Sequence, residues 1–302
     1  MSLIAGIDGG QSSTVAVIGD ESGRVLGRGI AGPADEVGAG RDSTRLRDAL
    51  HAALASALRA AKLPSASRFD AIVAGISGYD GSVYGRAPEL PSARASLMHD
   101  TPIAHAAALG GGAGVIVIAG TGSVVYGTSE NGWSCTLGGW GYLFGDEGSA
   151  FAIVRDALAR MMRAHDDGDA SLAAETQAAC EYFGVPSLRR LVHALYKGEL
   201  TRDRVASFAP QAMTYESLRP ISESGADRLA ALVRAAIAAG AAPRVAFIGG
   251  VFGDERFRER VRGRIVDVLP ATAIVESRYE PACGALLLAY RAAGMQIAEL
   301  AR

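Results

Sequence analysis

The chain has 302 residues, of which 49% are hydrophobic and 21% charged, and its formal net charge is −2. This length accommodates two domains, the composition is that of a globular protein, and the charge gives no support for binding nucleic acid or an anionic membrane. The three cysteines form no Cys-x-x-Cys motif. Since neither a signal sequence nor an apolar run of about 18 residues is present, we expect a cytoplasmic protein.

The elements of the first third alternate between strands and helices. Three consecutive strands are predicted at 3–7, 14–18 and 25–30, followed by a helix over 41–62, where apolar residues recur at helical spacing. A buried strand at 71–75, a short strand at 97–99 and a helix at 102–109 complete this part. Pro102 suits the first position of that last helix.

A glycine-rich stretch at 110–114 then marks a boundary, and the pattern starts again. Strands are predicted at 115–119, 123–128 and 133–137, followed by a helix over 144–164 and a mostly helical region at about 166–240. The chain closes with a strand at 245–248, a helix at 256–268, a strand at 273–275 and a helix at 281–293. Strands that feed helices predict an α/β fold with mixed sheets.

A glycine-rich turn follows the first strand of each half, at 9–14 and at 120–123. Glycines let backbone N–H groups face an anion, and Ser or Thr hydroxyls add hydrogen bonds. One interpretation is that the glycines merely form hairpin turns. Because the turn occurs twice, with Asp8 beside the first, we favour the interpretation that a duplicated fold binds one nucleotide. Neither lysine lies in a P-loop string, and the first turn lacks the Gly-x-Gly-x-x-Gly of dinucleotide sites.

The chain resembles the actin-like ATPase and sugar kinase superfamily, most closely the BadF/BadG-type ATPases and the N-acetylglucosamine kinases grouped with them. Five stretches carry this resemblance: 8–14, Asp100, 120–123, 138–149 and 248–252. The most specific is Gly-Gly-Trp-Gly followed by Gly-Asp-Glu-Gly-Ser.

The resemblance implies two ribonuclease H-like (actin-like ATPase) domains with a nucleotide cleft between them. We expect the N-terminal domain at 1–110 and the C-terminal domain at 111–289, with a helical insertion at about 166–240. A final helix at about 290–302 is expected to pack back on the first domain.

The resemblance also implies roles for single residues. Asp8 would hold Mg²⁺ or its water shell, and Asp100 would be the general base and contact the sugar. ATP would be bound by Gly9, Gly10, Ser12, Ser13, Thr14, Gly120, Thr121, Gly122, Gly249, Gly250 and Asp254. The sugar would be bound by Gly139, Trp140, Gly141 and Asp146.

Some of these residues have structural alternatives. Asp100 could simply cap the following helix, and Trp140 could belong to the core. Glu147 is expected to lie in the first turn of the helix over 144–164, where an acid suits the helix dipole. His99 is given no role, because neighbours along a strand point to opposite sides.

Two positions depart from the sugar kinase pattern. Asp35 stands where these kinases have an asparagine that reaches the substrate, and a carboxylate accepts hydrogen bonds but donates none. It would tolerate the ammonium of glucosamine at least as well as an acetamido group. The second departure lies at residues 217–220. The family often has Gly-Asp-Pro there, on the nucleotide side of the site, whereas this chain has Ser-Leu-Arg-Pro.

The predicted activity is ATP-dependent phosphorylation of an amino sugar, foremost N-acetylglucosamine at carbon 6, with glucosamine as the alternative substrate. An alternative of another class is a BadF-type ATPase that activates a redox partner, although Cys135, Cys180 and Cys283 do not suit an iron–sulfur cluster. A non-catalytic sugar sensor is disfavoured, because no DNA-binding helices precede the strand at 3–7. A homodimer is expected from the resemblance, without nucleic acid or membrane partners.

Overall fold

The computed structural model describes residues 2–36 and 39–301, and its contacts divide the chain into two compact units. The first unit comprises Met1–Gly112 together with Glu276–Arg302, and the second comprises Ala113–Val275. None of the helices in the described ranges is both long and apolar enough to span a membrane.

The first unit is built on a five-stranded sheet with the order β3-β2-β1-β4-β5. β1 pairs antiparallel with β2, and β2 with β3, whereas β1, β4 and β5 run parallel. The bounds are β1 Leu3–Gly9, β2 Thr14–Asp20, β3 Val25–Ala31, β4 Ala71–Ile76 and β5 Ala95–His99, which confirms the predicted strands.

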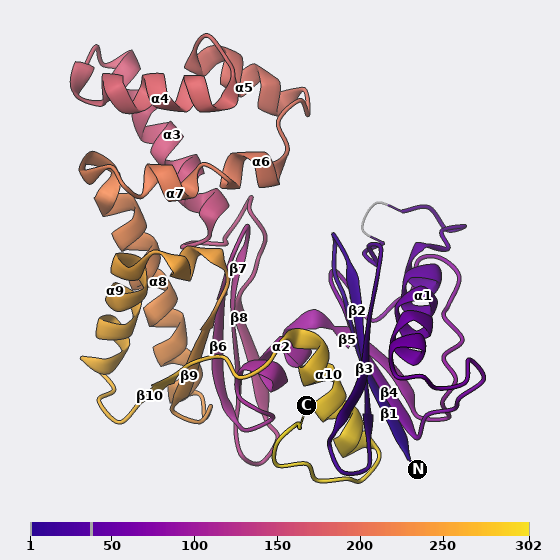
Figure 1. Ribbon diagram of the computed structural model, residues 1–302. Helices are drawn as coiled ribbons and strands as arrows, with labels where there is room; N and C mark the ends of the chain where they lie inside the picture. Colours follow the sequence, from indigo (N-terminus) through magenta and orange to yellow (C-terminus); the bar gives the residue numbers. More distant parts are fainter. Residues whose placement is uncertain (1, 37–38, 302) are drawn as a thin grey trace. The chain divides into compact units, whose positions relative to one another are not determined.

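Helices cover both faces of this sheet (Figure 1). Residues of β1 alternate between the two faces: Leu3, Ala5 and Ile7 pack with α1 (Arg45–Ala60), whereas Ile4 packs with α10 (Pro281–Ala292). α2 (Asp100–Ala108) lies beside α10 on the second face.

α10 confirms the helix predicted at 281–293, whereas the helix expected at about 290–302 is wrong, because the structure has none within residues 293–301. The whole of α10 belongs to the first unit. The cause is close packing on β1: a Cβ at Gly6 would stand 2.0 Å from the backbone nitrogen of Leu286. Glycine at this position brings helix and strand backbones together, which holds the end of the chain on the first sheet.

The second unit repeats this topology. Its sheet has the order β10-β9-β6-β7-β8, with β6, β7 and β8 antiparallel and β6, β9 and β10 parallel. The bounds are β6 Gly114–Ala119, β7 Ser123–Thr128, β8 Ser134–Gly138, β9 Arg244–Ile248 and β10 Ala273–Val275.

Long helices of the second unit pack on this sheet, and short ones form a separate cluster. α8 (Arg219–Ala238) and α9 (Glu255–Val266) share an apolar core with β6 and β9. A second apolar core joins α3 to the helical insertion, whose pair α4–α5 lies at the far end of α3 from the sheet (Figure 1). The remaining bounds are α3 Ala150–Asp166, η1 Ala170–Leu172, α4 Ala173–Phe183, α5 Leu188–Tyr196, α6 Arg202–Ala206, α7 Ala209–Ala212, η2 Glu216–Leu218 and η3 Gly250–Gly253.

Three helix starts differ from the prediction by two residues or more. α1 begins at Arg45 and not at 41. α2 begins at Asp100 and not at Pro102, because the His99 side chain caps it. α3 begins only at Ala150, with Ser149 as its cap, and not at 144. Asp146 and Gly148 have φ of +60° and +79°, which no right-handed helix accommodates. Asp146 and Glu147 therefore lie in a loop before the helix, so the expected place of Glu147 in its first turn is wrong.

Candidate active site

Three polar side chains gather where the parallel strands of the first unit end. Asp8 is the penultimate residue of β1, Ser77 follows β4 and Asp100 follows β5. The Ser77 N–H donates to the carbonyl of Gly9 at 2.9 Å, which ties the ends of β1 and β4 together. The Asp100 carboxylate is hydrogen-bonded by Ser77. Carboxyl ends of parallel strands are the usual place for a ligand in an α/β sheet.

The surroundings of Asp100 keep its carboxylate ionised. Burial by itself would raise its pKa, but hydrogen bonds from His99, Ser77 and Thr101 outweigh burial and hold the pKa below its ordinary value. Asp100 is the first residue of α2 and not its cap, so the alternative of a mere capping role is wrong. The arrangement provides a charged acceptor for a proton.

His99 contacts Asp100, contrary to the expectation that it has no part in the site. Its Nδ1 lies 2.9 Å from Asp100 Oδ1 and 2.9 Å from the Thr101 hydroxyl. The two residues do not alternate across a strand, because the helix begins at Asp100. With a proton, Nδ1 donates to the carboxylate; without one, it accepts from the Thr101 N–H at 3.2 Å. The hydrogen bond with Asp100 raises the pKa of His99, against the opposing effect of burial.

Asp8 stands among like charges. Burial, and next the charges of Asp100 and Glu280, raise the pKa of Asp8 from its ordinary 3.8 to about 6. Glu280 precedes the first turn of α10 and pairs with Arg28 through two hydrogen bonds of 2.9 and 3.0 Å. Such a group of carboxylates attracts a cation.

The geometry of these carboxylates suits a hydrated ion. Within residues 2–36 and 39–301, no three His, Cys, Asp or Glu side chains stand close enough together to hold a metal ion directly. Mg²⁺ is commonly bound through one or two carboxylates, several waters and phosphate oxygens. Asp8 therefore fits a Mg²⁺ ion held largely by its water shell and by a nucleotide.

The first glycine-rich turn is closed by a hydrogen bond from the Gly10 N–H to the Ser13 carbonyl at 2.9 Å. Ser12 and Ser13 are exposed at its tip. Gly9 is closely packed, because a Cβ there would stand 2.9 Å from the Cβ of Ala34. Thr14 is fully buried and its hydroxyl donates to the Gly32 carbonyl at 2.7 Å, so this side chain shapes the turn and does not face a ligand.

The segment that contains Asp35 runs beside this turn. The Ala34 N–H donates to the Gly10 carbonyl at 3.0 Å, and Arg45 Nη1 donates to the Asp35 carbonyl at 3.1 Å. These bonds hold Asp35, which is half-buried, near the first turn. The neighbouring residues 37–38 lie outside the described ranges.

In the second unit, the turn at 120–123 is joined to two other motifs. The Gly120 N–H donates to the Gly122 carbonyl at 2.9 Å, and the Gly120 carbonyl accepts from the N–H of Ala150, the first residue of α3, at 2.8 Å. A Cβ at Gly249, whose φ is +110°, would stand 2.3 Å from the Ala119 carbonyl. The Ser123 hydroxyl donates to the Glu147 carbonyl at 2.9 Å, so three of the five predicted stretches meet here.

The loop between β8 and α3 exposes large apolar side chains. Trp140 is 77% exposed and Phe144 86%, so the alternative of Trp140 as a core residue is wrong. The flanking Gly139 and Gly141 have φ of +68° and +82°, a conformation that favours glycine. An exposed tryptophan between two such glycines is free to contact a ligand.

Asp146, by contrast, is buried, with a side chain only 5% exposed. Its Oδ2 accepts a hydrogen bond from Nη2 of Arg202 at 3.4 Å. Asp146 thus lies against the turn at 120–123, since a Cβ at Gly122 would stand 2.8 Å from the same oxygen.

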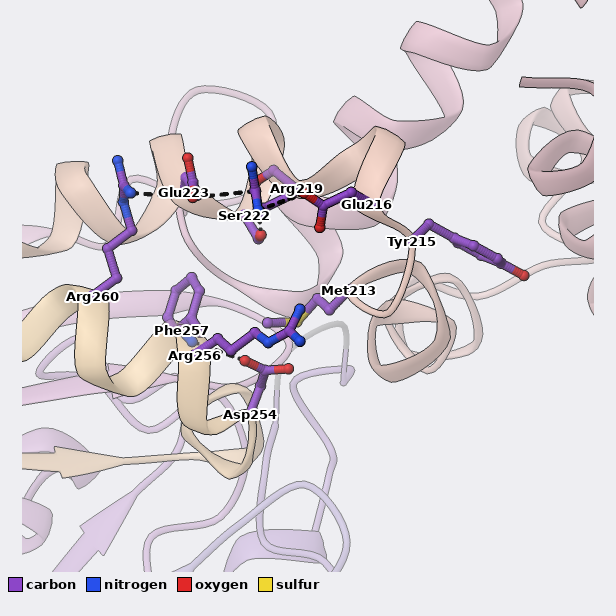
Figure 2. A pocket seen from close by; sticks show the side chains of 10 residues that line it. All are labelled: Met213, Tyr215, Glu216, Arg219, Ser222, Glu223, Asp254, Arg256, Phe257 and Arg260. Carbon is purple, nitrogen blue, oxygen red and sulfur yellow. Dashed lines mark hydrogen bonds and ion pairs between the residues drawn. The ribbon is translucent and has the colours of Figure 1, made fainter. Parts of the chain in front are cut away.

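A pocket of about 400 Å³ lies between α8 and α9 and contains Asp254 (Figure 2). Asp254 caps α9, and its Oδ1 accepts from the Phe257 N–H at 2.8 Å. The lining of the pocket also includes Tyr215, Glu216 and Arg219. Of these, Arg219 belongs to the stretch 217–220 that departs from the family's Gly-Asp-Pro. Gly249 and Gly250, the pair expected to border adenosine, are not among the residues that line this pocket.

Four residues near these sites were not predicted. Ser77 and Glu280 carry a weak sequence signal: Ser77 directly follows a buried apolar run, and Glu280 precedes a proline that starts a helix. A role for His99 could be foreseen only by knowing that α2 begins at Asp100. Arg202 has no signal, because only the fold brings the insertion to Asp146.

Comparison with known proteins gives one family match over almost the whole chain. The sequence profile of the BadF/BadG/BcrA/BcrD ATPase family matches residues 5–289. An N-acetylmuramic acid/N-acetylglucosamine kinase of Clostridium acetobutylicum is 32% identical over 111 residues, 37% of this chain and 36% of that protein. An N-acetyl-D-glucosamine kinase of Dictyostelium discoideum is 29% identical over 178 residues, 54% of this chain and 55% of that protein. The aligned region thus spans about a third to a half of these curated relatives.

A solved structure extends the similarity to the full chain. A candidate N-acetylglucosamine kinase from Chromobacterium violaceum superposes with a TM-score of 0.72 and 25% identity, over 95% of this chain and 99% of that one. The two sheets of like topology, one in each unit, agree with the fold of that protein.

Proposed function

Because this chain belongs to the BadF/BadG/BcrA/BcrD ATPase family, we propose that it uses ATP to phosphorylate a hydroxyl group of an amino sugar. The observation that carries the proposal is the ionised Asp100 at the carboxyl ends of β1, β4 and β5. The full-length similarity to a candidate N-acetylglucosamine kinase supports the choice of a sugar as acceptor.

In this proposal Asp100 orients the sugar hydroxyl and accepts its proton. The bond between that oxygen and the γ-phosphorus forms while the bond from phosphorus to the β–γ bridging oxygen breaks, and ADP leaves. Phosphoryl transfer depends on positioning and charge neutralisation more than on a strong base. Asp100 therefore need not be a strong base, and its low pKa keeps it ionised and able to orient the sugar hydroxyl.

The two glycine-rich turns are proposed to hold the phosphates. Gly9, Gly10, Ser12 and Ser13 of the first unit would bind the phosphates, as would 120–122 of the second unit. The pocket beside Asp254 would take the adenosine. Mg²⁺ near Asp8 would neutralise phosphate charge when bound. The raised pKa of Asp8, about 6 without the ion, supports a cation at that position.

The proposed acceptor is N-acetylglucosamine, as the names of the similar kinases suggest. The hydroxyl on carbon 6 is the proposed position of transfer. Glucosamine is the second candidate, because the Asp35 carboxylate can accept a hydrogen bond from an ammonium group. Trp140 with its two glycines, and Asp146, would line the sugar site.

An ATPase that activates a redox partner is less well supported. Cys135, Cys180 and Cys283 lie on β8, α4 and α10, and none of the three forms a disulfide. None belongs to a cluster that could hold a metal within the described ranges. The homodimer and the cytoplasmic location stay predictions.

A coupled assay of ADP release tests the proposal. MgATP is supplied with no sugar, N-acetylglucosamine, glucosamine or glucose, and stimulation by one amino sugar supports the kinase. ATP hydrolysis unchanged by every sugar would overturn it.

Asp100→Asn removes the proton acceptor at nearly constant shape. We expect the rate of transfer to fall by orders of magnitude, while the melting temperature still rises on binding MgATP. Near-normal turnover of this variant would exclude Asp100 from the reaction.

A further inference from the structure

Arg202 reaches from the helical insertion into the proposed sugar site. It is the first residue of α6, whose Val205 and Ala206 are buried in the insertion's apolar core. The Thr201 hydroxyl caps the helix by accepting from the Arg204 N–H at 3.2 Å. These contacts fix the backbone from which the Arg202 side chain extends.

The Arg202 guanidinium contacts two parts of the loop between β8 and α3. Nη2 donates to Asp146 Oδ2 at 3.4 Å, and Cζ lies 5.4 Å from the centre of the Tyr142 ring. The Tyr142 ring in turn packs edge-on against Phe151 of α3, with 5.3 Å between ring centres. The guanidinium is therefore held in place on a fixed aromatic ring, with 40% of its side chain exposed.

Asp146 is a buried charge in a conformation that a non-glycine residue seldom adopts. Its φ of +60° places it in the left-handed region, and its side chain is 5% exposed. A buried carboxylate is costly unless it is paired, and a left-handed conformation persists only where its surroundings hold it. Arg202 supplies the pairing.

The pair lies directly over the turn at 120–123. A Cβ at Gly122 would stand 2.7 Å from Arg202 Nη2 and 2.8 Å from Asp146 Oδ2. Glycine at 122 thus leaves space for both groups beside a turn proposed to hold phosphate.

We propose that Arg202 is a substrate-positioning residue, which holds the Asp146 carboxylate in the orientation that accepts hydrogen bonds from the sugar hydroxyls. This inference rests on the proposed sugar kinase function. It makes the helical insertion part of the sugar site, because α6 supplies the group that orders the loop between β8 and α3.

The test compares Arg202→Gln and Arg202→Lys with the natural protein. We expect Arg202→Gln to raise KM for the preferred amino sugar about tenfold, with KM for ATP and kcat within about threefold. Arg202→Lys keeps the charge but loses the planar fork, and should recover part of this loss. Calorimetric titration with the amino sugar alone should show the same loss of affinity.

Arg204→Gln is the matched control on the same helix. Arg204 stacks on Tyr182, at 4.3 Å from the ring centre, and donates to the Tyr182 carbonyl, both within the insertion. This variant should lower the melting temperature and leave KM for the sugar unchanged. An equal rise of KM in both variants would attribute the effect to a loosened insertion and overturn the inference.

The remaining outcomes separate the two proposals. If the natural protein is stimulated by an amino sugar and Arg202→Gln has the same KM, only the role of Arg202 falls. If the natural protein neither binds nor phosphorylates any of the sugars, the kinase proposal and the role of Arg202 fall together.

Discussion

Replacing Asp8 with asparagine is expected to stabilise the metal-free protein while removing its response to MgATP. The pKa of Asp8 is raised from 3.8 to about 6 in the folded state, first by burial and then by Asp100 and Glu280. Each unit of pKa difference corresponds to about 1.4 kcal/mol, so above pH 6 the ionised Asp8 costs the folded state about 3 kcal/mol. Asparagine has a similar shape and no charge.

The sign of the effect determines its pH dependence. Between about pH 6 and pH 4 the folded state takes up the proton before the unfolded state does, so the cost of Asp8 disappears as the pH falls. The stability advantage of Asp8→Asn should therefore be largest above pH 7, fall to roughly half by pH 5 and approach zero below pH 4. At each pH, the free energy of unfolding of the natural protein is subtracted from that of the variant. The contributions of the other titrating groups cancel in this difference.

The assay is urea unfolding followed by circular dichroism, in EDTA, at several pH values between 4 and 8. Asp70→Asn, at an exposed position directly before β4, is the control and should show no such difference. In a parallel measurement MgATP should raise the melting temperature of the natural protein but not of Asp8→Asn. A variant that is no more stable at pH 7.5, or a difference that does not change with pH, would refute the reasoning.

Three further variants test other parts of the site and fold. His99→Ala removes the hydrogen bond that lowers the pKa of Asp100, so the acidic limb of the kcat/KM profile should move to higher pH, and an unmoved limb would contradict this. Asp35→Asn should shift the kcat/KM ratio from glucosamine toward N-acetylglucosamine by about tenfold, measured with both sugars in one assay, whereas an unchanged ratio would exclude Asp35 from this choice. Tyr290→Phe removes a buried hydroxyl that donates to the Asp20 carbonyl at 2.6 Å. It should cost about 1 kcal/mol in urea unfolding without altering KM, and no measurable loss of stability would show that this bond is dispensable.

The local pattern of the chain determined the elements and their duplication. Apolar runs bounded by glycine predicted the strands of both sheets within two residues at each end, because strands buried in a sheet are rich in apolar residues. The motif at 138–149 and the turn at 120–123 pointed to one site, and the structure joins them through the hydrogen bond from the Ser123 hydroxyl to the Glu147 carbonyl at 2.9 Å.

Only the tertiary structure decided which residues act together. Burial and the charges of Asp100 and Glu280, which come from distant parts of the chain, raise the pKa of Asp8. Asp146 pairs with Arg202 of α6, which lies 56 residues further along the sequence. The starts of α2 and α3 depended on single caps and a left-handed residue, which hydrophobic periodicity does not report. Periodicity records which face of an element is buried, whereas pairing of charges depends on distances between elements that are set only when the chain packs.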